Sequence, residues 1–337
     1  MKTHIEKCLS GEHLTVAEAS NALDTIMTGQ ATDSQIAGLM IALRAKGETV
    51  DELVGFARTM RDHSIKVHIE DPDAIDMCGT GGDCSGTFNI STVASFIAAG
   101  AGVTVAKHGN RSVSSQSGSA DVLTALGVNI QCSAETVQAC INRIGIGFLF
   151  APQYHPAMKY ASKPRAELGV RSIFNIIGPL TNPAGVKRQL VGTYNPRAMH
   201  LLAHALQELG VDKACVVHSD DGMDEVALSG GTKVQEVSKN EQPREYHLMP
   251  EDFGYAQLTL DGLRGGDKNV NALIALNVLK GGKGPAREVV VANAALGIYV
   301  SGKARTILEG KQKAEESLNS GRALEKLQKL IHYTDQP

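Results

Sequence analysis

The chain has 337 residues, enough for about two domains, and its 42% hydrophobic and 20% charged residues are typical of a globular protein with a large core. A formal net charge of −3, the absence of tryptophan and only 4% aromatic residues argue against nucleic acid or an anionic membrane as partner. The six cysteines form no CxxC pair, so we expect reduced thiols and neither a disulfide framework nor a zinc site.

No segment of the sequence reads as a membrane anchor or an export signal. The first residues, Met1–Lys7, include no apolar stretch of the kind found in a signal peptide. The longest mostly apolar run, Phe96–Ala106, is far shorter than the roughly 20 residues that a membrane-spanning helix requires. We therefore expect a cytoplasmic protein.

The first seventy residues carry repeated signals for helix starts. Three capping boxes each precede an apolar stripe of helical period, at Thr15-x-x-Glu18, Thr32-x-x-Gln35 and Thr49-x-x-Glu52. Gly29 and Gly47 stand where the first two of these helices should end. We expect a small helical domain over residues 1–70, and its polar side chains show no convergent set that would indicate chemistry of its own.

From about Asp73 short apolar strands alternate with helical runs. The expected strands are 75–78, 103–106, 148–151, 190–194 and 214–218, followed by 233–237 and 245–248. The expected helices are 91–101, 120–126, 133–144 and 197–209, and three more, 270–279, 287–300 and 304–318, close the chain. This alternation predicts an α/β fold with a mostly parallel central sheet covered by helices on both faces. Ligands in such sheets bind outside the carboxyl ends of the strands.

The segment from Tyr154 to Pro183 interrupts this alternation. We expect its middle to be helical, with Leu168, Ser172 and Asn175 on one side that packs back on the N-terminal helices. A returning segment of about 160–185 would then complete the helical domain, and 71–159 together with 186–337 would form the α/β domain. A chain that crosses between two domains in this way forms a hinge with a cleft beside it.

Two consecutive strand ends open into loops rich in small and polar residues. The first strand runs into Gly79–Asp83, where three glycines let the backbone turn tightly and direct its N–H groups at a ligand. Asn89–Thr92 then begin a helix, where we expect the side chains to cap free N–H groups and the helix end to attract anions. The second strand ends at Lys107. Neither the Walker A nor the GxGxxG pattern is present, and a plain glycine-rich turn is the alternative, but together these features favour a phosphate ligand.

Two further groups of charged residues fit such a ligand. The adjacent carboxylates Asp224 and Glu225 suit Mg²⁺, which prefers oxygen ligands and bridges to phosphate oxygens; a solvated acidic turn is the alternative. Arg165, in the crossing segment, could bind a carboxylate through bidentate hydrogen bonds from its guanidinium group, or could form an ordinary surface ion pair.

The histidines give weaker signals. His108 follows Lys107 and could contact a substrate, while His155 and His218 are weaker candidates, and a structural role is the default for each. No Ser/His/Asp or Cys/His arrangement and no HExxH pattern stands out, so covalent catalysis is not indicated.

The motifs described above occur together in one known family. In order they are Gly79–Asp83, Asn89–Thr92, Lys107–Arg111, Arg165, Asn175–Pro183 and Asp224–Glu225. In this combination, and over almost its whole length, the chain resembles the anthranilate phosphoribosyltransferases of tryptophan biosynthesis. That family shares the fold of the class II nucleoside phosphorylases, with a helical domain joined to an α/β domain, usually in a homodimer. Ser172 and Ile176–Ile177 depart mildly, since Thr and often Leu-Leu are expected there.

The resemblance implies which residues hold the two substrates and the metal. Phosphoribosyl pyrophosphate would be held by Gly79, Gly82, Asp83, Thr87, Asn89, Ile90, Ser91, Thr92, Lys107, His108, Gly109, Asn110, Arg111, Ser112, Val113, Ser114, Ser115 and Ser119. Anthranilate would contact Gly79, Asn110 and Arg165, with His108 nearby, and Ser91, Asp224 and Glu225 would ligate two Mg²⁺ ions.

The chemistry of such a transfer agrees with the residues. Departure of pyrophosphate from the ribose C1 leaves an oxocarbenium-like state, and Lys107, backbone N–H groups and Mg²⁺ can stabilise the growing negative charge. The aromatic amine is already neutral at pH 7, so positioning it requires no strong base. This explains why the sequence shows no obvious nucleophile or general base. Closure of the hinge would bring Arg165 and the bound acceptor to the donor.

Two other functions remain open from the sequence. A pyrimidine nucleoside phosphorylase of the same fold would bind inorganic phosphate and a nucleoside, and would not need Asp224 and Glu225 for a metal. A non-catalytic protein that senses or stores a phosphorylated metabolite would gain little from two added carboxylates. Metal dependence of activity separates the first alternative from the transferase, and the acidic pair argues against the second.

Overall fold

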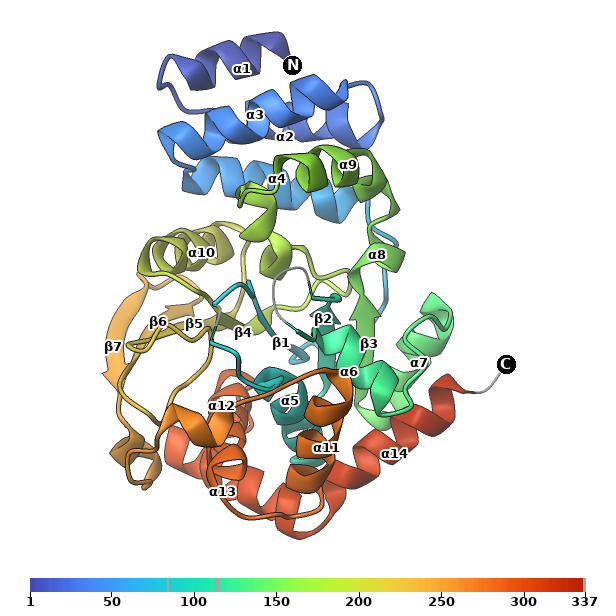
Figure 1. Ribbon diagram of the computed structural model, residues 1–337, viewed down its shortest axis with the longest axis vertical. Coiled ribbons are helices and arrows are strands. Elements are labelled where there is room, and N and C mark those ends of the chain that lie inside the picture. Colours follow the sequence, from blue (N-terminus) through green and yellow to red (C-terminus); the bar gives the residue numbers. More distant parts are fainter. Residues whose placement is uncertain (84, 113–115, 336–337) are drawn as a thin grey trace.

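The computed structural model describes residues 1–83, 85–112 and 116–335, and it shows a helical bundle standing on a larger α/β domain (Figure 1). The larger domain contains a seven-stranded sheet in the order β3-β2-β1-β4-β5-β6-β7. The strands span β1 Ile75–Gly79, β2 Val105–Gly109, β3 Ile146–Phe150, β4 Arg188–Gly192, β5 Lys213–Ser219, β6 Thr232–Ser238 and β7 Arg244–Leu248. The first five strands pair in parallel, whereas β6 pairs antiparallel with both β5 and β7, which confirms the predicted mostly parallel sheet.

Helices cover both faces of this sheet, as the strand–helix alternation predicted. Helices α5 and α12 pack on one face and α10 packs on the other. The helices of this domain are α5 Ile90–Gly100, α6 Ser119–Ala125, α7 Ala134–Ile144, α10 Pro196–Glu208, α11 Lys268–Leu279, α12 Pro285–Val300, α13 Ile307–Asn319 and α14 Arg322–Thr334. None of the helices in the described ranges is long and apolar enough to cross a membrane.

The helix α14 was not predicted, because we expected the chain to close with the helix that ends near Leu318. Gly321, at φ +77°, turns the chain after α13, and α14 then buries Ala323, Leu327 and Leu330 against α5 and α7. The apolar spacing in α14 is helical, so the sequence did contain a signal for it.

The helical bundle forms where the capping signals predicted it. Its helices are α1 Lys2–Leu9, α2 Val16–Met27, α3 Asp33–Lys46 and α4 Val50–Asp62. All three predicted capping boxes are present, with each Thr hydroxyl accepting from the backbone N–H three residues later and the Glu or Gln side chain accepting from the Thr N–H. Gly29 and Gly47 adopt positive φ just after α2 and α3, as a helix end requires.

The returning segment differs from its prediction in one respect. After α8 (Ala151–Tyr154), helix α9 runs from Lys159 to Leu168 and stops there, because Gly169 takes the left-handed conformation. The predicted shared face of Leu168, Ser172 and Asn175 is therefore wrong, since Asn175 belongs to a separate 3₁₀ turn, Ile173–Asn175, and Ser172 precedes that turn.

The returning segment nevertheless lies against the helical bundle. Helix α9 packs on α3 and α2, and the Phe174 ring meets Phe56 of α4 edge-on at 5.9 Å between ring centroids. These contacts support the assignment of residues 160–185 to the helical domain, which we propose together with the division of the α/β domain into 71–159 and 186–337.

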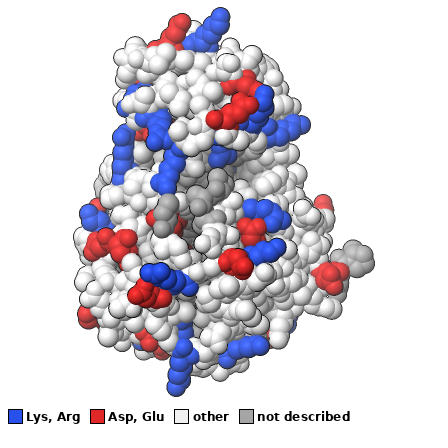
Figure 2. Space-filling model, viewed as in Figure 1, with Lys and Arg blue, Asp and Glu red and all other residues white. Residues whose placement is uncertain are grey.

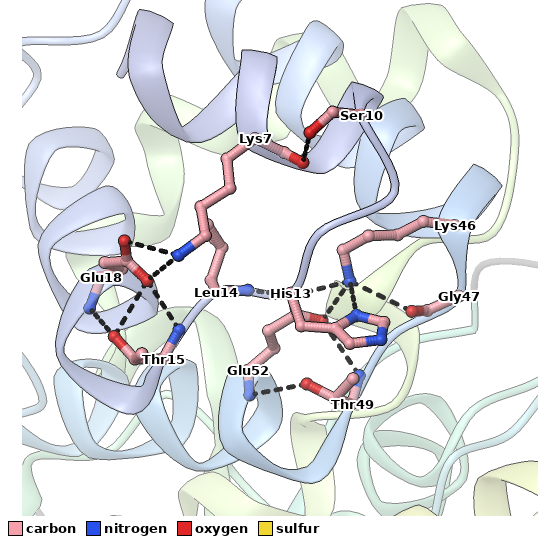
Figure 3. A network of polar contacts seen from close by, with 10 residues as sticks. All are labelled: Lys7, Ser10, His13, Leu14, Thr15, Glu18, Lys46, Gly47, Thr49 and Glu52. Atoms are coloured by element: carbon pink, nitrogen blue, oxygen red, sulfur yellow. Dashed lines mark hydrogen bonds and ion pairs between the residues drawn. The ribbon is translucent and has the colours of Figure 1, made fainter.

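An ion pair is buried inside the helical bundle (Figure 3). The Lys46 ammonium nitrogen lies 2.7 Å from Glu52 Oε1, and the two side chains are 4% and 0% exposed. The Glu52 carboxylate also accepts the backbone N–H groups of Leu14 and Thr49, each at 2.9 Å, and His13 Nδ1 lies 3.1 Å from the ammonium. Glu52 therefore fixes the entries of two helices and neutralises a buried cation.

Glu52→Gln should destabilise the bundle strongly, because removing one member of a buried pair leaves an unpaired buried charge, at a cost of about 3–5 kcal/mol. Urea unfolding monitored by far-UV circular dichroism measures this loss. The matched control is Asp33→Asn in the exposed Lys163–Asp33 pair, which should leave the midpoint almost unchanged. Equal urea midpoints for wild type and Glu52→Gln would show that the Lys46–Glu52 pair does not stabilise the bundle.

Candidate active site

The candidate site lies where the strand order of the sheet reverses. From β1 the chain continues to β2 and β3 on one side, while β4 and β5 lie on the other. The loops that follow β1, β2 and β4 therefore meet at one edge, which is where α/β sheets bind ligands. This edge lies below the helical bundle in Figure 1, and Figure 2 shows a hollow at that level with Lys and Arg side chains along its upper rim.

The acidic pair is tied directly to the glycine loop and to the start of α5. Asp224 Oδ2 accepts the Gly81 N–H at 2.9 Å, and Glu225 Oε1 accepts the Ser91 N–H at 3.0 Å. A Cβ added at Gly79 would lie 2.7 Å from Asp224 Oδ2, so a side chain at the end of β1 would displace that carboxylate. Segments more than 130 residues apart are thus joined where the sequence predicted a phosphate loop and a metal pair.

The two carboxylates are buried close to each other and to a third acid, Asp83. Burial raises the pKa of Asp224, and the nearby Asp83 carboxylate adds to that shift. Burial likewise raises the pKa of Glu225, with Asp224 as the second cause, while Lys107 acts in the opposite direction on both pKa values. A cation bound between the carboxylates would reduce this repulsion, so the site favours cation binding.

The oxygen atoms of Asp224, Glu225 and Ser91 suit a metal ion that takes its remaining ligands from water and substrate. Within the described ranges no group of three or more His, Cys, Asp and Glu side chains is arranged to hold a metal ion by itself. Two carboxylates with the Ser91 hydroxyl nearby match the habit of Mg²⁺, which keeps several waters and completes its shell with substrate phosphates.

Lys107 lies beside these groups as the sequence predicted. Its side chain is buried, its ammonium donates to the Met77 carbonyl of β1, and it lies 3.5 Å from the Ser91 hydroxyl. The ammonium therefore lies between β1 and the start of α5, where it could bind an anion held at the helix N-terminus.

The start of α5 is not capped as predicted. Asn89 occupies the N-cap position without a capping bond, and instead its amide donates to the Ser117 carbonyl and accepts from Asn271 Nδ2, both at 3.1 Å. Glu225 takes the Ser91 N–H that a cap would have taken, and the buried Thr92 hydroxyl has no partner within the described residues. The expectation that Asn89, Ser91 and Thr92 cap the helix with their side chains is therefore wrong.

Asn89 is held from a part of the chain that sequence reasoning missed. Asn271 of α11 is buried and also accepts the Gly266 N–H at 2.8 Å, while Thr87 pairs with Arg264 in an isolated β-bridge. Nothing in the spacing around Asn271 indicated this contact.

The predicted residues after β2 lie in a compact loop. The Arg111 guanidinium pairs with Asp121 at 2.7 Å, Asp121 also accepts the Ser112 N–H, and the Ser119 hydroxyl donates to the Asn110 carbonyl at 3.3 Å. Gly109 closes β2 against the Phe148 ring. Three residues also predicted for this loop, Val113, Ser114 and Ser115, lie outside the described residues.

Two buried histidines lie together near the hinge. The rings of His108 and His155 are 5.3 Å apart, and burial lowers their pKa values to about 3 and about 4. Both are therefore neutral at physiological pH. His218 instead places Nδ1 2.9 Å from the Thr193 carbonyl oxygen, which is a structural contact.

A buried carboxylate behind His108 was also missed. Asp76 accepts the His108 N–H at 3.0 Å and the Asn182 amide at 2.8 Å, which ties β1 to β2 and to the returning segment. Burial raises the pKa of Asp76. A charged residue within an apolar strand run was the sequence signal for it.

Arg165 stands apart from the phosphate loop. Its guanidinium carbon lies 5.2 Å from the centroid of the Phe174 ring, and burial lowers its pKa. Among the described residues no carboxylate forms an ion pair with it, and no hydrogen bond joins it to Gly79 or Asn110. The guanidinium charge is therefore left without an acidic partner among the described residues.

Comparison with known proteins identifies the family. The glycosyl transferase family helical bundle domain matches residues 2–64, and the glycosyl transferase family a/b domain matches residues 71–324. The anthranilate phosphoribosyltransferase of Pelotomaculum thermopropionicum is 50% identical over 334 residues, which cover 99% of this chain and 96% of that protein. The chain belongs to the anthranilate phosphoribosyltransferase family.

Solved structures agree with this placement. The crystal structure of anthranilate phosphoribosyltransferase from Thermus thermophilus superposes with a TM-score of 0.94 at 40% identity, over 99% of each chain. The Saccharomyces cerevisiae enzyme in complex with PRPP and Mg gives a TM-score of 0.91 at 28% identity, over 99% of this chain and 97% of that one.

The two buried histidines should make the protein less stable in acid. Their pKa values are lower in the folded than in the unfolded state, so the unfolded state binds more protons below pH 6.5, and stability falls as the pH drops from 6.5 towards about 4. Each histidine should contribute about 1.4 kcal/mol per pH unit in this range. The free energy of unfolding, measured with urea at several pH values in this range, should therefore change less steeply with pH for His155→Gln than for wild type.

The exposed His247 provides the control, and His247→Gln should keep the wild-type slope. Identical slopes for His155→Gln and wild type would show that His155 charges in the folded protein.

Proposed function

We propose that this chain transfers the phosphoribosyl group of 5-phosphoribosyl 1-pyrophosphate to the amine of anthranilate, giving N-(5-phosphoribosyl)anthranilate and pyrophosphate, in tryptophan biosynthesis. The carrying observation is the convergence of the acidic pair, the glycine loop and the start of α5, linked by the Asp224–Gly81 and Glu225–Ser91 hydrogen bonds. Membership of the family and the overlap with a PRPP and Mg complex support the choice of substrates.

The donor end of the reaction depends on electrostatic stabilisation. The N–H groups of the glycine loop, the N-terminus of α5 and the Lys107 ammonium face the pyrophosphate and hold it as negative charge grows on it. Bound Mg²⁺, held by Ser91, Asp224 and Glu225, supplies further charge neutralisation on the leaving group. The remaining donor contacts are assigned to Gly79, Gly82, Asp83, Thr87, Asn89, Ile90, Thr92, the loop 108–115 and Ser119.

The acceptor end depends on positioning. The amine of anthranilate is neutral at pH 7, so no side chain needs to remove a proton before attack on C1. Arg165 grips the anthranilate carboxylate and Gly79 and Asn110 contact the molecule, while the neutral His108 lines the site without repelling the guanidinium. Because Arg165 belongs to the returning segment, closure of the hinge brings the acceptor to the donor.

Three finer points belong to the same proposal. Two Mg²⁺ ions act in the site, the protein works in the cytoplasm, and it forms a homodimer through the helical bundle. Exposed apolar side chains on the adjoining elements α1, α3 and α9, namely Leu9, Ile41 and Tyr160, support this choice of dimer surface.

The central test follows the loss of anthranilate fluorescence with purified protein, phosphoribosyl pyrophosphate and Mg²⁺. Wild type should consume anthranilate, and excess EDTA should stop the reaction. Asp224→Asn combined with Glu225→Gln should lower kcat by at least about 100-fold, because an electrostatic group aimed at developing charge is worth about that much. The fold should persist, since replacing two buried carboxylates that repel each other removes that electrostatic repulsion.

Full activity in EDTA would favour a phosphorylase of this fold, and unchanged kcat in the paired variant would remove the metal assignment. Phosphorolysis of a pyrimidine nucleoside by inorganic phosphate, assayed in parallel, distinguishes the two enzymes directly.

Arg165→Ala should raise the KM for anthranilate by at least about tenfold while changing the KM for phosphoribosyl pyrophosphate little, since a charged hydrogen-bond partner contributes about 1.5–3 kcal/mol. Steady-state kinetics with each substrate varied in turn measure both constants. Arg143→Ala on α7, away from the crossing segment, is the control. Equal increases in the two KM values would show that Arg165 does not grip the acceptor.

A further inference from the structure

Arg171 connects the returning segment to the glycine loop, although the sequence assigned it no role. Its guanidinium donates to the Gly82 carbonyl and lies over the Tyr194 ring, with the guanidinium carbon 4.1 Å from the ring centroid. Tyr194 follows β4, so this one side chain touches the loops after two neighbouring strands. A Cβ added at Gly82 would lie 3.1 Å from Arg171 Nη2, which shows how close the approach is.

The contact falls on a pair of glycines in an unusual backbone conformation. Gly81 and Gly82 both take positive φ, at +63° and +80°, and glycine allows many orientations of the peptide plane, so contacts to the loop help to decide which one it adopts. A carbonyl oxygen turned towards a pyrophosphate would repel it, whereas an N–H would attract it. By donating to the Gly82 carbonyl, Arg171 fixes the orientation of the peptide between Gly82 and Asp83.

Arg171 is itself anchored to the helical bundle. The Arg44 guanidinium of α3 donates to the Arg171 carbonyl, and helix α9, which packs on α3, ends three residues earlier at Leu168. The segment that carries Arg165 therefore also carries the residue that holds the glycine loop. The contacts run without a break from α3 through Arg171 to Gly82.

We infer that Arg171 is a positioning residue for the phosphoribosyl donor: its guanidinium holds the Gly82 carbonyl so that the loop presents N–H groups to the pyrophosphate. This inference rests on the proposed function and extends it. The same linkage makes the donor loop sensitive to the position of the helical bundle, while the acceptor is gripped elsewhere, by Arg165. Arg171 does not touch substrate in this account.

The first experiment is Arg171→Ala, with both KM values measured by anthranilate fluorescence. The KM for phosphoribosyl pyrophosphate should rise about 10-fold to 100-fold, as expected for loss of a charged donor, while the KM for anthranilate changes less than about threefold. Arg58→Ala is the matched control, since the Arg58 guanidinium also donates to a backbone carbonyl across two elements, that of Glu208, but far from the site. A failure of wild type to turn over would refute the proposed function and not this inference.

Chemical rescue separates positioning from general stability. Guanidinium chloride at about 10 mM, well below denaturing concentrations, should lower the donor KM of Arg171→Ala towards wild type and leave Arg58→Ala unaffected. An unchanged donor KM in a folded Arg171→Ala protein, an equal rise in both KM values, or a raised donor KM that guanidinium does not lower would overturn the inference.

Arg171→Lys keeps the test valid if Arg171→Ala does not fold. Lysine keeps the charge but lacks the planar group that stacks on Tyr194 while donating to Gly82, so the donor KM should still rise. Kinetics of Arg171→Lys indistinguishable from wild type would contradict the inference.

Discussion

The site depends on two hydrogen bonds that hold a buried acidic pair against backbone N–H groups. Asp224 accepts from Gly81 and Glu225 accepts from Ser91, so the chain after β5 is fixed to the loop after β1 and to the start of α5. A side chain at position 79 would displace the Asp224 carboxylate from its present position. Because the carboxylates are buried beside Asp83, the arrangement is electrostatically incomplete without a cation and its anionic counterpart.

This incompleteness explains the form of the proposed catalysis. In the proposed mechanism the buried Lys107 and the N-terminus of α5 would stabilise the leaving group, Asp224 and Glu225 would hold a metal that adds to this charge neutralisation, and no side chain would act as nucleophile. The helical bundle is linked to the site through the returning segment, where Arg171 donates to the Gly82 carbonyl and where we propose that Arg165 binds the acceptor. The bundle itself is stabilised by local capping and by the buried Lys46–Glu52 pair, neither of which takes part in the chemistry.

The parts that followed from sequence were those set by local patterns. Capping boxes fixed the helices of the bundle, strand–helix alternation fixed the parallel sheet, and residues at strand ends converged as that topology requires. One failure depended on a distant partner, because Asn89 looked like a helix cap but bonds to Asn271. The other was local, because Gly169 takes the left-handed conformation and ends a helix that appeared to continue to Asn175. The role of Arg171 could not be predicted, because its partner is a backbone carbonyl and carries no sequence signature.

A crystal structure of the protein grown with Mg²⁺ and phosphoribosyl pyrophosphate tests the central claim most directly. The account predicts diphosphate density against the Gly79–Asp83 loop and the first turn of α5, within reach of the Lys107 ammonium, and a cation between that diphosphate and the carboxylates of Asp224 and Glu225. Diphosphate bound at another edge of the sheet, or both carboxylates turned away from it with no cation between, would contradict the account.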